Sequence, residues 1–115
     1  FFRNQVRKFI ENDGYQVVDA EDGQVAWDYL KNHPDEVMLV VTDLEMPNMD
    51  GFELTKNIKA DQRFAVLPVI ALTSLASDEH VAKGKEVGID DYQIKLDREK
   101  LLQSIADHLS NLNLN

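Results

Sequence analysis

Two long apolar runs constrain the fold of this chain most. "VMLVV" (residues 37–41) and "LPVIAL" (residues 67–72) show no alternation of polar and apolar side chains. A strand that is covered on both faces has this pattern, whereas a strand with one wet face alternates. The two runs therefore predict central strands of a parallel sheet with helices on both sides, and Pro68 is expected near the start of its strand.

Shorter segments predict the elements around these two strands. "YQVVD" (residues 15–19) and "DYQIK" (residues 91–95) are rich in strand-forming residues and are bounded by turn residues. Apolar spacing predicts helices from the N-terminus to Gly14, over residues 24–32, 51–60 and 77–87, and after Asp97, which can cap the last one. The helix at 77–87 has few core residues and is expected to be the most mobile or the most partner-dependent element. Alternating helices and strands predict a doubly wound, three-layer αβα fold.

The length of 115 residues fits one domain. We assign residues 1–109 to it and residues 110–115, "SNLNLN", to a polar C-terminal tail that frays. No repeat, linker or second domain is expected.

Composition and charge narrow the function classes. The chain has no cysteine, which excludes disulfides and thiolate metal sites and fits a cytoplasmic location. The net charge of −9 opposes binding to a nucleic acid, for which a basic patch is expected. The longest run without a charge, residues 64–77, is shorter than the roughly 20 residues of a membrane helix, so we expect no membrane insertion.

Three polar residues end successive strands of the predicted sheet. Asp43, Thr73 and Lys95 would meet at the carboxyl edge, where ligands bind in open parallel sheets. Each also has an ordinary structural explanation: Asp43 as a turn former, Thr73 as a hydroxyl bonded to backbone, and Lys95 as a solvated charge that prevents edge pairing. Their occurrence at three neighbouring strand ends favours a functional site.

The segments around these residues resemble the receiver domains of response regulators. "VVTDLEMPNMDGFEL" is similar to the phosphoacceptor segment of that family, "PVIALTS" to its fourth strand and "GIDDYQIK" to its fifth. The similarity extends from Phe1 to about Leu109 and implies a flavodoxin-like or CheY-like fold. The continuation "IKLDREKLL" looks most like receivers of chemotaxis-type, CheA-like hybrid histidine kinases.

The resemblance implies a role for each strand-end residue. Asp43 would accept a phosphoryl group from a phosphohistidine of a histidine kinase or a histidine phosphotransfer domain. Thr73, Lys95 and Mg²⁺ would stabilise the phosphoryl oxygens, with the Asp43 carboxylate and the Glu45 backbone carbonyl as metal ligands. The domain would catalyse its own phosphotransfer and hydrolysis and would not be an independent turnover enzyme, although its parent chain would be a kinase.

Three further positions match regulatory positions of the family. Glu45 and Leu75 occupy the positions that tune the rate of hydrolysis of the acyl phosphate. Tyr92 matches an aromatic switch that turns inward when the phosphoryl group draws Thr73 toward it. The alternative for Tyr92 is an ordinary half-exposed strand tyrosine.

The sequence departs from the family pattern in two places. Receivers begin with a central strand that ends in two acidic metal ligands, and we expect this first strand to be missing from the chain given. If it is truly absent, strand exchange or a dimer should fill the gap. Leu96 replaces the usual proline after the lysine, so we expect a trans peptide bond there and a different loop path around Lys95.

Two other functions compete with the phosphoacceptor. A receiver-like interaction module that is never phosphorylated needs no acidic pair, so the residues before Phe1 would distinguish it. A haloacid-dehalogenase-like phosphatase also places a nucleophilic aspartate after a buried strand, but "DLE" lacks that family's second aspartate. His33, His80 and His108 have no metal-like spacing to other ligands, so surface roles are expected for them.

Overall fold

Helices and strands alternate along the chain. The computed structural model describes residues 2–44, 46–73, 78–94 and 97–113. In chain order its elements are α1 (Phe2–Asn12), α2 (Gly23–Asn32), β1 (Val40–Asp43), α3 (Gly51–Ala60), β2 (Val69–Thr73), α4 (Asp78–Val87), β3 (Asp91–Ile94) and α5 (Arg98–Asn113). The strands form a parallel sheet in the order β1-β2-β3, which confirms the predicted α/β class with a parallel sheet.

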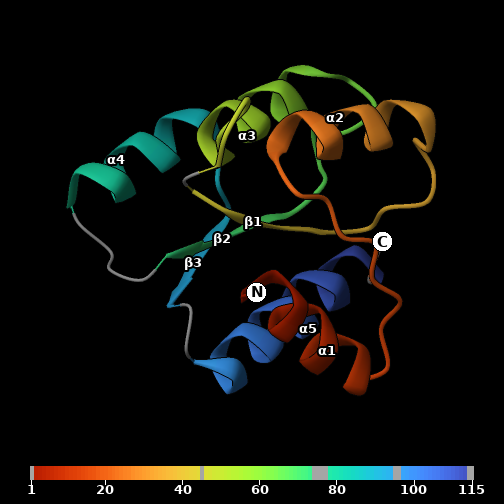
Figure 1. Cartoon of the computed structure of the whole chain (residues 1–115). Helices are drawn as coiled ribbons and strands as arrows, with labels where there is room; N and C mark the ends of the chain where they lie inside the picture. Colours follow the sequence, from red (N-terminus) through yellow and green to blue (C-terminus); the bar gives the residue numbers. More distant parts are fainter. Residues whose placement is uncertain (1, 45, 74–77, 95–96, 114–115) are drawn as a thin grey trace.

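Helices cover both faces of the sheet. Figure 1 shows α1 and α5 below the strands, and α2, α3 and α4 above them. All five residues of β2 are buried. Val69 and Ala71 pack toward α2, α3 and α4, whereas Ile70 and Leu72 pack toward α1 and α5. The central strand therefore has two apolar faces, as its continuous apolar run predicts.

Two apolar layers fill the space between helices and sheet. On the α2 and α3 side, Leu54 and Ile58 are almost fully buried, and Trp27 packs edge-on against Phe64 with ring centroids 5.9 Å apart. The α1 and α5 side is filled by the residues Val6, Ile10, Leu101 and Ile105, which pack against Ile70 and Leu72.

Aspartate side chains begin three of the helices. Asp22, Asp50 and Asp97 each accept a hydrogen bond from the backbone N–H three residues later, at 3.0, 2.9 and 3.1 Å. Such N-caps satisfy N–H groups that have no partner within the helix. The predicted capping role of Asp97 is confirmed.

A charged cluster joins α3 to the amino end of the sheet. Lys59 Nζ donates to the Leu67 carbonyl at 2.7 Å and to Asp90 Oδ2 at 2.9 Å, and the same Asp90 oxygen accepts from the Val69 N–H at 2.8 Å. We call Lys59 and Asp90 the amino-end pair. These bonds connect α3 with the segments that enter β2 and β3.

Residues 15–19 do not form the predicted strand. Their side chains still alternate between half-buried and exposed, with Tyr15 and Val17 packed on the α1 and α5 side and Val18 63% exposed. A strand also needs a neighbour for its backbone hydrogen bonds. Among the described residues, no strand pairs with this segment, and this explains the difference.

Among the described strands, residues 37–41 do not take the predicted central position. Strand β1 begins later, at Val40, and lies at the edge of the sheet, paired with β2 alone among the described strands. Met38, which precedes β1, is 54% exposed.

The last helix extends further than expected. Helix α5 continues to Asn113, beyond Ser110, where the polar tail was predicted to begin. The segment from Arg98 to Asn113 contains neither glycine nor proline, so nothing in it breaks the helix.

Candidate functional site

The parallel register brings Asp43 and Thr73 to the same edge of the sheet. Asp43 is aligned with Leu72 in the β1–β2 ladder, so Thr73 is the next residue along the neighbouring strand. Asp43 is half-buried and Thr73 is 7% exposed. Asp43 and Thr73 therefore lie at the same carboxyl edge of the sheet, on neighbouring strands.

Short-range contacts hold the backbone at Asp43. Its Oδ1 accepts a hydrogen bond from the Leu44 N–H at 2.9 Å, and its carbonyl accepts one from Thr42 Oγ1 at 2.9 Å. Gly51, the first residue of α3, packs so closely on the Asp43 carbonyl that a Cβ atom would collide with it. The Gly51 N–H also bonds the Leu44 carbonyl at 3.1 Å. These contacts fix the direction in which the carboxylate leaves the strand.

Several predicted site residues lie outside the described part of the chain. These are Glu45, Leu75 and Lys95, and their predicted roles are untested. Within the described ranges, no group of three or more histidine, aspartate or glutamate side chains could hold a metal ion. Of the two predicted Mg²⁺ ligands, Asp43 is the one that lies in the described part of the chain.

Tyr92 lies between the sheet and α4. Its ring packs against the cluster of Leu44, Phe52, Ala71 and Ile89, and its hydroxyl end fills the space beside Gly84, where a Cβ atom would collide with it. Burial raises the pKa of the Tyr92 hydroxyl above its ordinary value of 10.0. The ring thus has the contacts needed to link the site edge to α4, while its switching role stays a prediction.

Sequence reasoning missed a pair of polar residues near Asp43. Asp22 is only 5% exposed and accepts a hydrogen bond from Asn48 Nδ2 at 2.7 Å, although the two residues are 26 positions apart. The bonds from the Val25 N–H and from Asn48 lower the pKa of the Asp22 carboxyl. The "AEDG" segment indicated a turn, but nothing in it indicated a partner in another loop.

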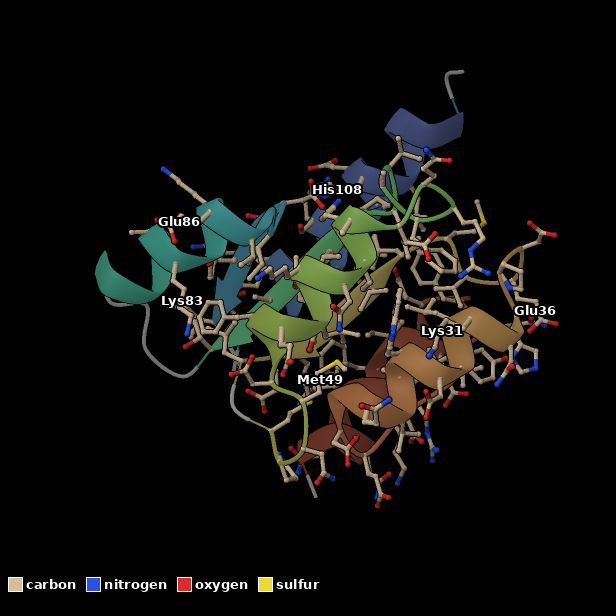
Figure 2. The ribbon with its side chains drawn as sticks, turned by 90° about the horizontal axis from the view of Figure 1, so that it is seen from above. Lys31, Glu36, Met49, Lys83, Glu86 and His108 are labelled. Atoms are coloured by element: carbon tan, nitrogen blue, oxygen red, sulfur yellow. The ribbon has the colours of Figure 1, made fainter. Side chains whose placement is uncertain are left out.

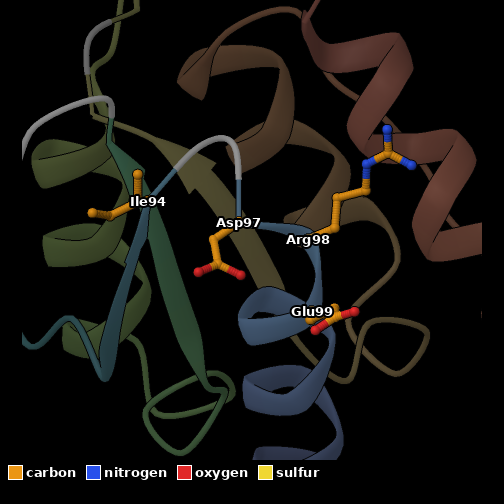
Figure 3. Close-up of a pocket in the computed structure, with 4 residues that line it drawn as sticks. All are labelled: Ile94, Asp97, Arg98 and Glu99. Atoms are coloured by element: carbon orange, nitrogen blue, oxygen red, sulfur yellow. The ribbon is translucent and has the colours of Figure 1, made fainter.

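A hollow lies where the chain passes from β3 to α5. It is lined by Ile94, Asp97, Arg98 and Glu99, and Figure 3 shows Arg98 directed away toward α1. The Arg98 guanidinium lies 5.8 Å from the centroid of the Phe9 ring, and Asp97 caps α5. Arg98 and Asp97, two of the charged residues that line the hollow, therefore already make contacts within the fold.

Comparison with known families identifies the class of protein. The family model "Response regulator receiver domain" matches residues 1–106, which is most of the chain. The chain therefore belongs to the response regulator receiver family, and the predicted resemblance is confirmed.

Individual relatives and structures agree with this family. The chain is 40% identical over 94 residues to the gliding motility regulatory protein of Myxococcus xanthus, covering 80% of the chain and 12% of that protein. It is 35% identical over 95 residues to the chemotaxis protein CheY1 of Helicobacter pylori, covering 78% of the chain and 76% of the relative. The signal receiver domain of a Syntrophus aciditrophicus signal transduction histidine kinase superimposes with a TM-score of 0.84 and 28% identity, covering 94% of this chain and 81% of that one.

The extent of these matches differs between relatives. The chain spans 12% of the Myxococcus protein and 34% of the response regulator GtcR of Aneurinibacillus migulanus. A domain of this kind thus occurs within much longer proteins. In the part that the structure describes, no helix is both long and apolar enough to cross a membrane.

Proposed function

We propose that this receiver domain is a phosphoacceptor in two-component signalling, and that Asp43 takes the phosphoryl group from a phosphohistidine of a histidine kinase or a histidine phosphotransfer domain. The observation that carries the proposal is the placement of the Asp43 carboxylate at the carboxyl end of β1, with the buried Thr73 on the next strand. Membership of the receiver family supports the same reaction.

The reaction follows from the chemistry of a carboxylate nucleophile. A carboxylate oxygen of Asp43 attacks the phosphorus, the bond between phosphorus and the histidine nitrogen breaks, and an acyl phosphate forms. The Leu44 N–H bond and the contact with Gly51 orient the carboxylate before the reaction, which lowers the entropic part of the barrier. The Thr73 hydroxyl donates to a phosphoryl oxygen, and Lys95 stabilises the negative charge. Water later hydrolyses the acyl phosphate, at a rate tuned by Glu45 and Leu75.

Mg²⁺ fits this site as an ion with ligands from both the protein and the phosphoryl group. Mg²⁺ prefers oxygen ligands, retains several waters and is commonly held by one or two carboxylates plus phosphate oxygens. The Asp43 carboxylate and the Glu45 backbone carbonyl are the residues that would hold it. When bound, the ion neutralises charge on the phosphoryl oxygens.

The switch would act through Tyr92. Its ring packs against the cluster of Leu44, Phe52, Ala71 and Ile89 and fills the space beside Gly84 of α4. Movement of Thr73 toward the phosphoryl group would change the room available to the ring, and thereby the position of α4. The surface around α4 is the one we expect to respond.

Two finer proposals concern the rest of the protein. The parent is a chemotaxis-type hybrid histidine kinase, in keeping with the small fraction of the Myxococcus relative that this domain spans. A further strand pairs with β1 in the intact domain and supplies the acidic metal ligands. The edge position of β1 and the strand-like alternation of residues 15–19 support this second proposal.

Phosphorylation by a small phosphodonor tests the function. With Mg²⁺ and acetyl phosphate or phosphoramidate, we expect one phosphoryl group per chain, in a linkage that survives acid and is released by alkali or hydroxylamine. The same chain extended upstream should react faster if the missing strand supplies metal ligands. An adduct that persists unchanged in Asp43→Asn would overturn the assignment.

One observation favours a second candidate, a receiver-like interaction module that is not phosphorylated. Within the described residues, no carboxylate cluster accompanies Asp43, and a single carboxylate makes a weak site for a hard cation. This candidate predicts no adduct in either the given or the extended chain, with partner binding unaffected by Asp43→Asn.

A further inference from the structure

The carboxylate of Asp22 joins two segments that are distant in sequence. Its Oδ1 accepts from the Val25 N–H at 3.0 Å, which caps α2. Its Oδ2 accepts from Asn48 Nδ2 at 2.7 Å, in the loop that follows Asp43. Both carboxylate oxygens are therefore used, and the side chain is buried between α2 and the loop. A hydrogen bond to an ionised carboxylate is about twice as strong as a neutral one.

The residue after Asp22 makes a second connection to the same loop. The Gly23 N–H donates to the Met49 carbonyl at 3.0 Å, and a Cβ atom at Gly23 would collide with that carbonyl. Figure 2 shows Met49 in the loop before α3, close to α2. The backbone of α2 thus begins directly against the loop backbone. We call the contacts of Asp22 and Gly23 with Asn48 and Met49 the α2 clamp.

The loop that the clamp holds has a restricted shape. Asn48 has a φ of 67°, in the left-handed region that asparagine tolerates better than most residues. The Met49 N–H closes a tight turn onto the Pro47 carbonyl at 2.7 Å. At its far end the loop enters α3 at Gly51, which packs on the Asp43 carbonyl. The clamp and the contact at Gly51 therefore hold the same short loop at two points.

We propose that Asp22 is a positioning residue for the chemistry of Asp43, because its bond to Asn48 sets the shape of the loop that follows the phosphoacceptor. The proposal rests on the proposed phosphoacceptor function and adds a residue to it. A carboxylate that only capped α2 would need one oxygen, as Asp50 does in capping α3. The second oxygen of Asp22 is used to hold the loop, and a loop held in advance spares the reaction the entropy of ordering it.

Exchanging the two polar groups tests the clamp. Asn48→Asp places two carboxylates face to face, and their repulsion should release the loop. In the double variant Asp22→Asn/Asn48→Asp, the amide at position 22 donates to the carboxylate at position 48. The hydrogen bond is therefore restored in the opposite direction, and the net charge equals that of the wild type. Asp22→Asn alone should have a small effect, because asparagine still caps α2 and the Asn48 amide can turn to present its oxygen.

Amide hydrogen exchange and the rate of phosphorylation are measured on the same three variants. In Asn48→Asp we expect amide hydrogen exchange at Gly23 and Met49 to become about tenfold faster, and phosphorylation of Asp43 by acetyl phosphate to become about tenfold slower, as for the loss of a charged bond. The double variant should return to within about threefold of the wild type on both measurements. Asp50→Asn is the matched control at the other cap, and it should change neither measurement, while thermal unfolding detects any general loss of stability.

The outcomes separate the clamp from the proposed function. If Asn48→Asp behaves like the wild type, or if the double variant is as impaired as Asn48→Asp, the clamp does not position the loop and the inference is wrong. If the wild type takes up no phosphoryl group, the proposed function fails, and the exchange rates still decide whether the clamp exists. If exchange follows the expected pattern while phosphorylation stays constant in a phosphorylatable chain, the clamp is structural only and the positioning role is wrong.

Discussion

The two ends of the sheet both carry charged residues, but the contacts of these residues differ between the two ends. At the amino end, Lys59 and Asp90 bond each other and the backbone around β2. At the carboxyl end, the Asp43 carboxylate is fixed by its own neighbours and remains half-buried at the strand end. The amino-end pair connects structural elements, whereas the carboxyl end presents the carboxylate that we propose as the phosphoacceptor.

The difference follows from the geometry of a parallel sheet. The carboxyl ends of the strands lead into loops that precede helices, and ligands of open parallel sheets bind there. The amino ends receive the chain from the preceding helices, and charges there are available to fix the connections. Variants at the amino end should therefore affect stability alone, whereas variants at the carboxyl end should also affect phosphorylation.

The largest effect is expected for Gly51→Ala at the carboxyl end. The new methyl group would meet the Asp43 carbonyl, and neither backbone can withdraw without moving β1 or α3. We expect a loss of about 3 kcal/mol in the free energy of unfolding and a marked fall in the rate of phosphorylation. Urea unfolding and acetyl phosphate labelling measure the two effects. If Gly51→Ala is as stable and reactive as the wild type, the close contact does not hold Asp43.

Asp90→Ala at the amino end should affect stability alone. It leaves the Lys59 ammonium and the Val69 N–H without the carboxylate that accepts from both. The expected loss is about 1–2 kcal/mol, with an unchanged rate of phosphorylation per folded molecule. Asp35→Ala removes an exposed aspartate and serves as the control, with an expected change under about 0.5 kcal/mol. A phosphorylation defect in fully folded Asp90→Ala would contradict the proposed division between the two ends.

Gly84→Ala tests the contact between the carboxyl end and α4. In an exposed helix this change stabilises by about 1 kcal/mol, but here the new methyl group would collide with the Tyr92 hydroxyl end. We expect no gain in stability, and a Tyr92 pKa that falls back toward 10.0 as the ring leaves its site. Alkaline titration of tyrosinate absorbance, with Tyr92→Phe subtracted, measures this pKa. If Gly84→Ala is more stable than the wild type and the pKa of Tyr92 is unchanged, the Tyr92 ring does not occupy the space beside Gly84.

The smallest effect concerns the dependence of stability on acid. The pKa of Asp22 is lowered from its ordinary value of 3.8 in the folded chain, chiefly by the Val25 N–H bond. Its contribution to stability is therefore complete above the unfolded value and is lost as the pH falls through the lower folded value. The difference in Tm between wild type and Asp22→Asn should shrink between about pH 6 and pH 2. If the difference in Tm does not change with pH, the ionised form of Asp22 does not stabilise the fold more than the neutral form does.

Local patterns in the sequence predicted much of the fold. Helix α3 was predicted over the residues that it occupies, because glycine and aspartate mark its start and the apolar spacing is regular. The convergence of Asp43 and Thr73 also followed from strand order alone, since parallel strands end at one edge. These features depend on few residues near one another in sequence.

Features that depend on distant partners could not be predicted in this way. Residues 15–19 have the alternation of a strand, yet strand formation depends on whether another strand lies beside them. The bond between Asp22 and Asn48 depends on how α2 packs against a loop 26 positions away. The sequence indicated a turn at "AEDG" and a sharply turning loop after Asp43, and neither signal indicates that the two segments are bonded to each other.

The packing of Trp27 against Phe64 supplies a fluorescent reporter within the protein. Trp27 is the single tryptophan of the sequence, and it lies on α2, in the helix that begins at the α2 clamp. Its emission therefore comes from one known environment on the face opposite α1 and α5. A change in this emission on addition of a phosphodonor would reveal a movement of α2 without any attached dye.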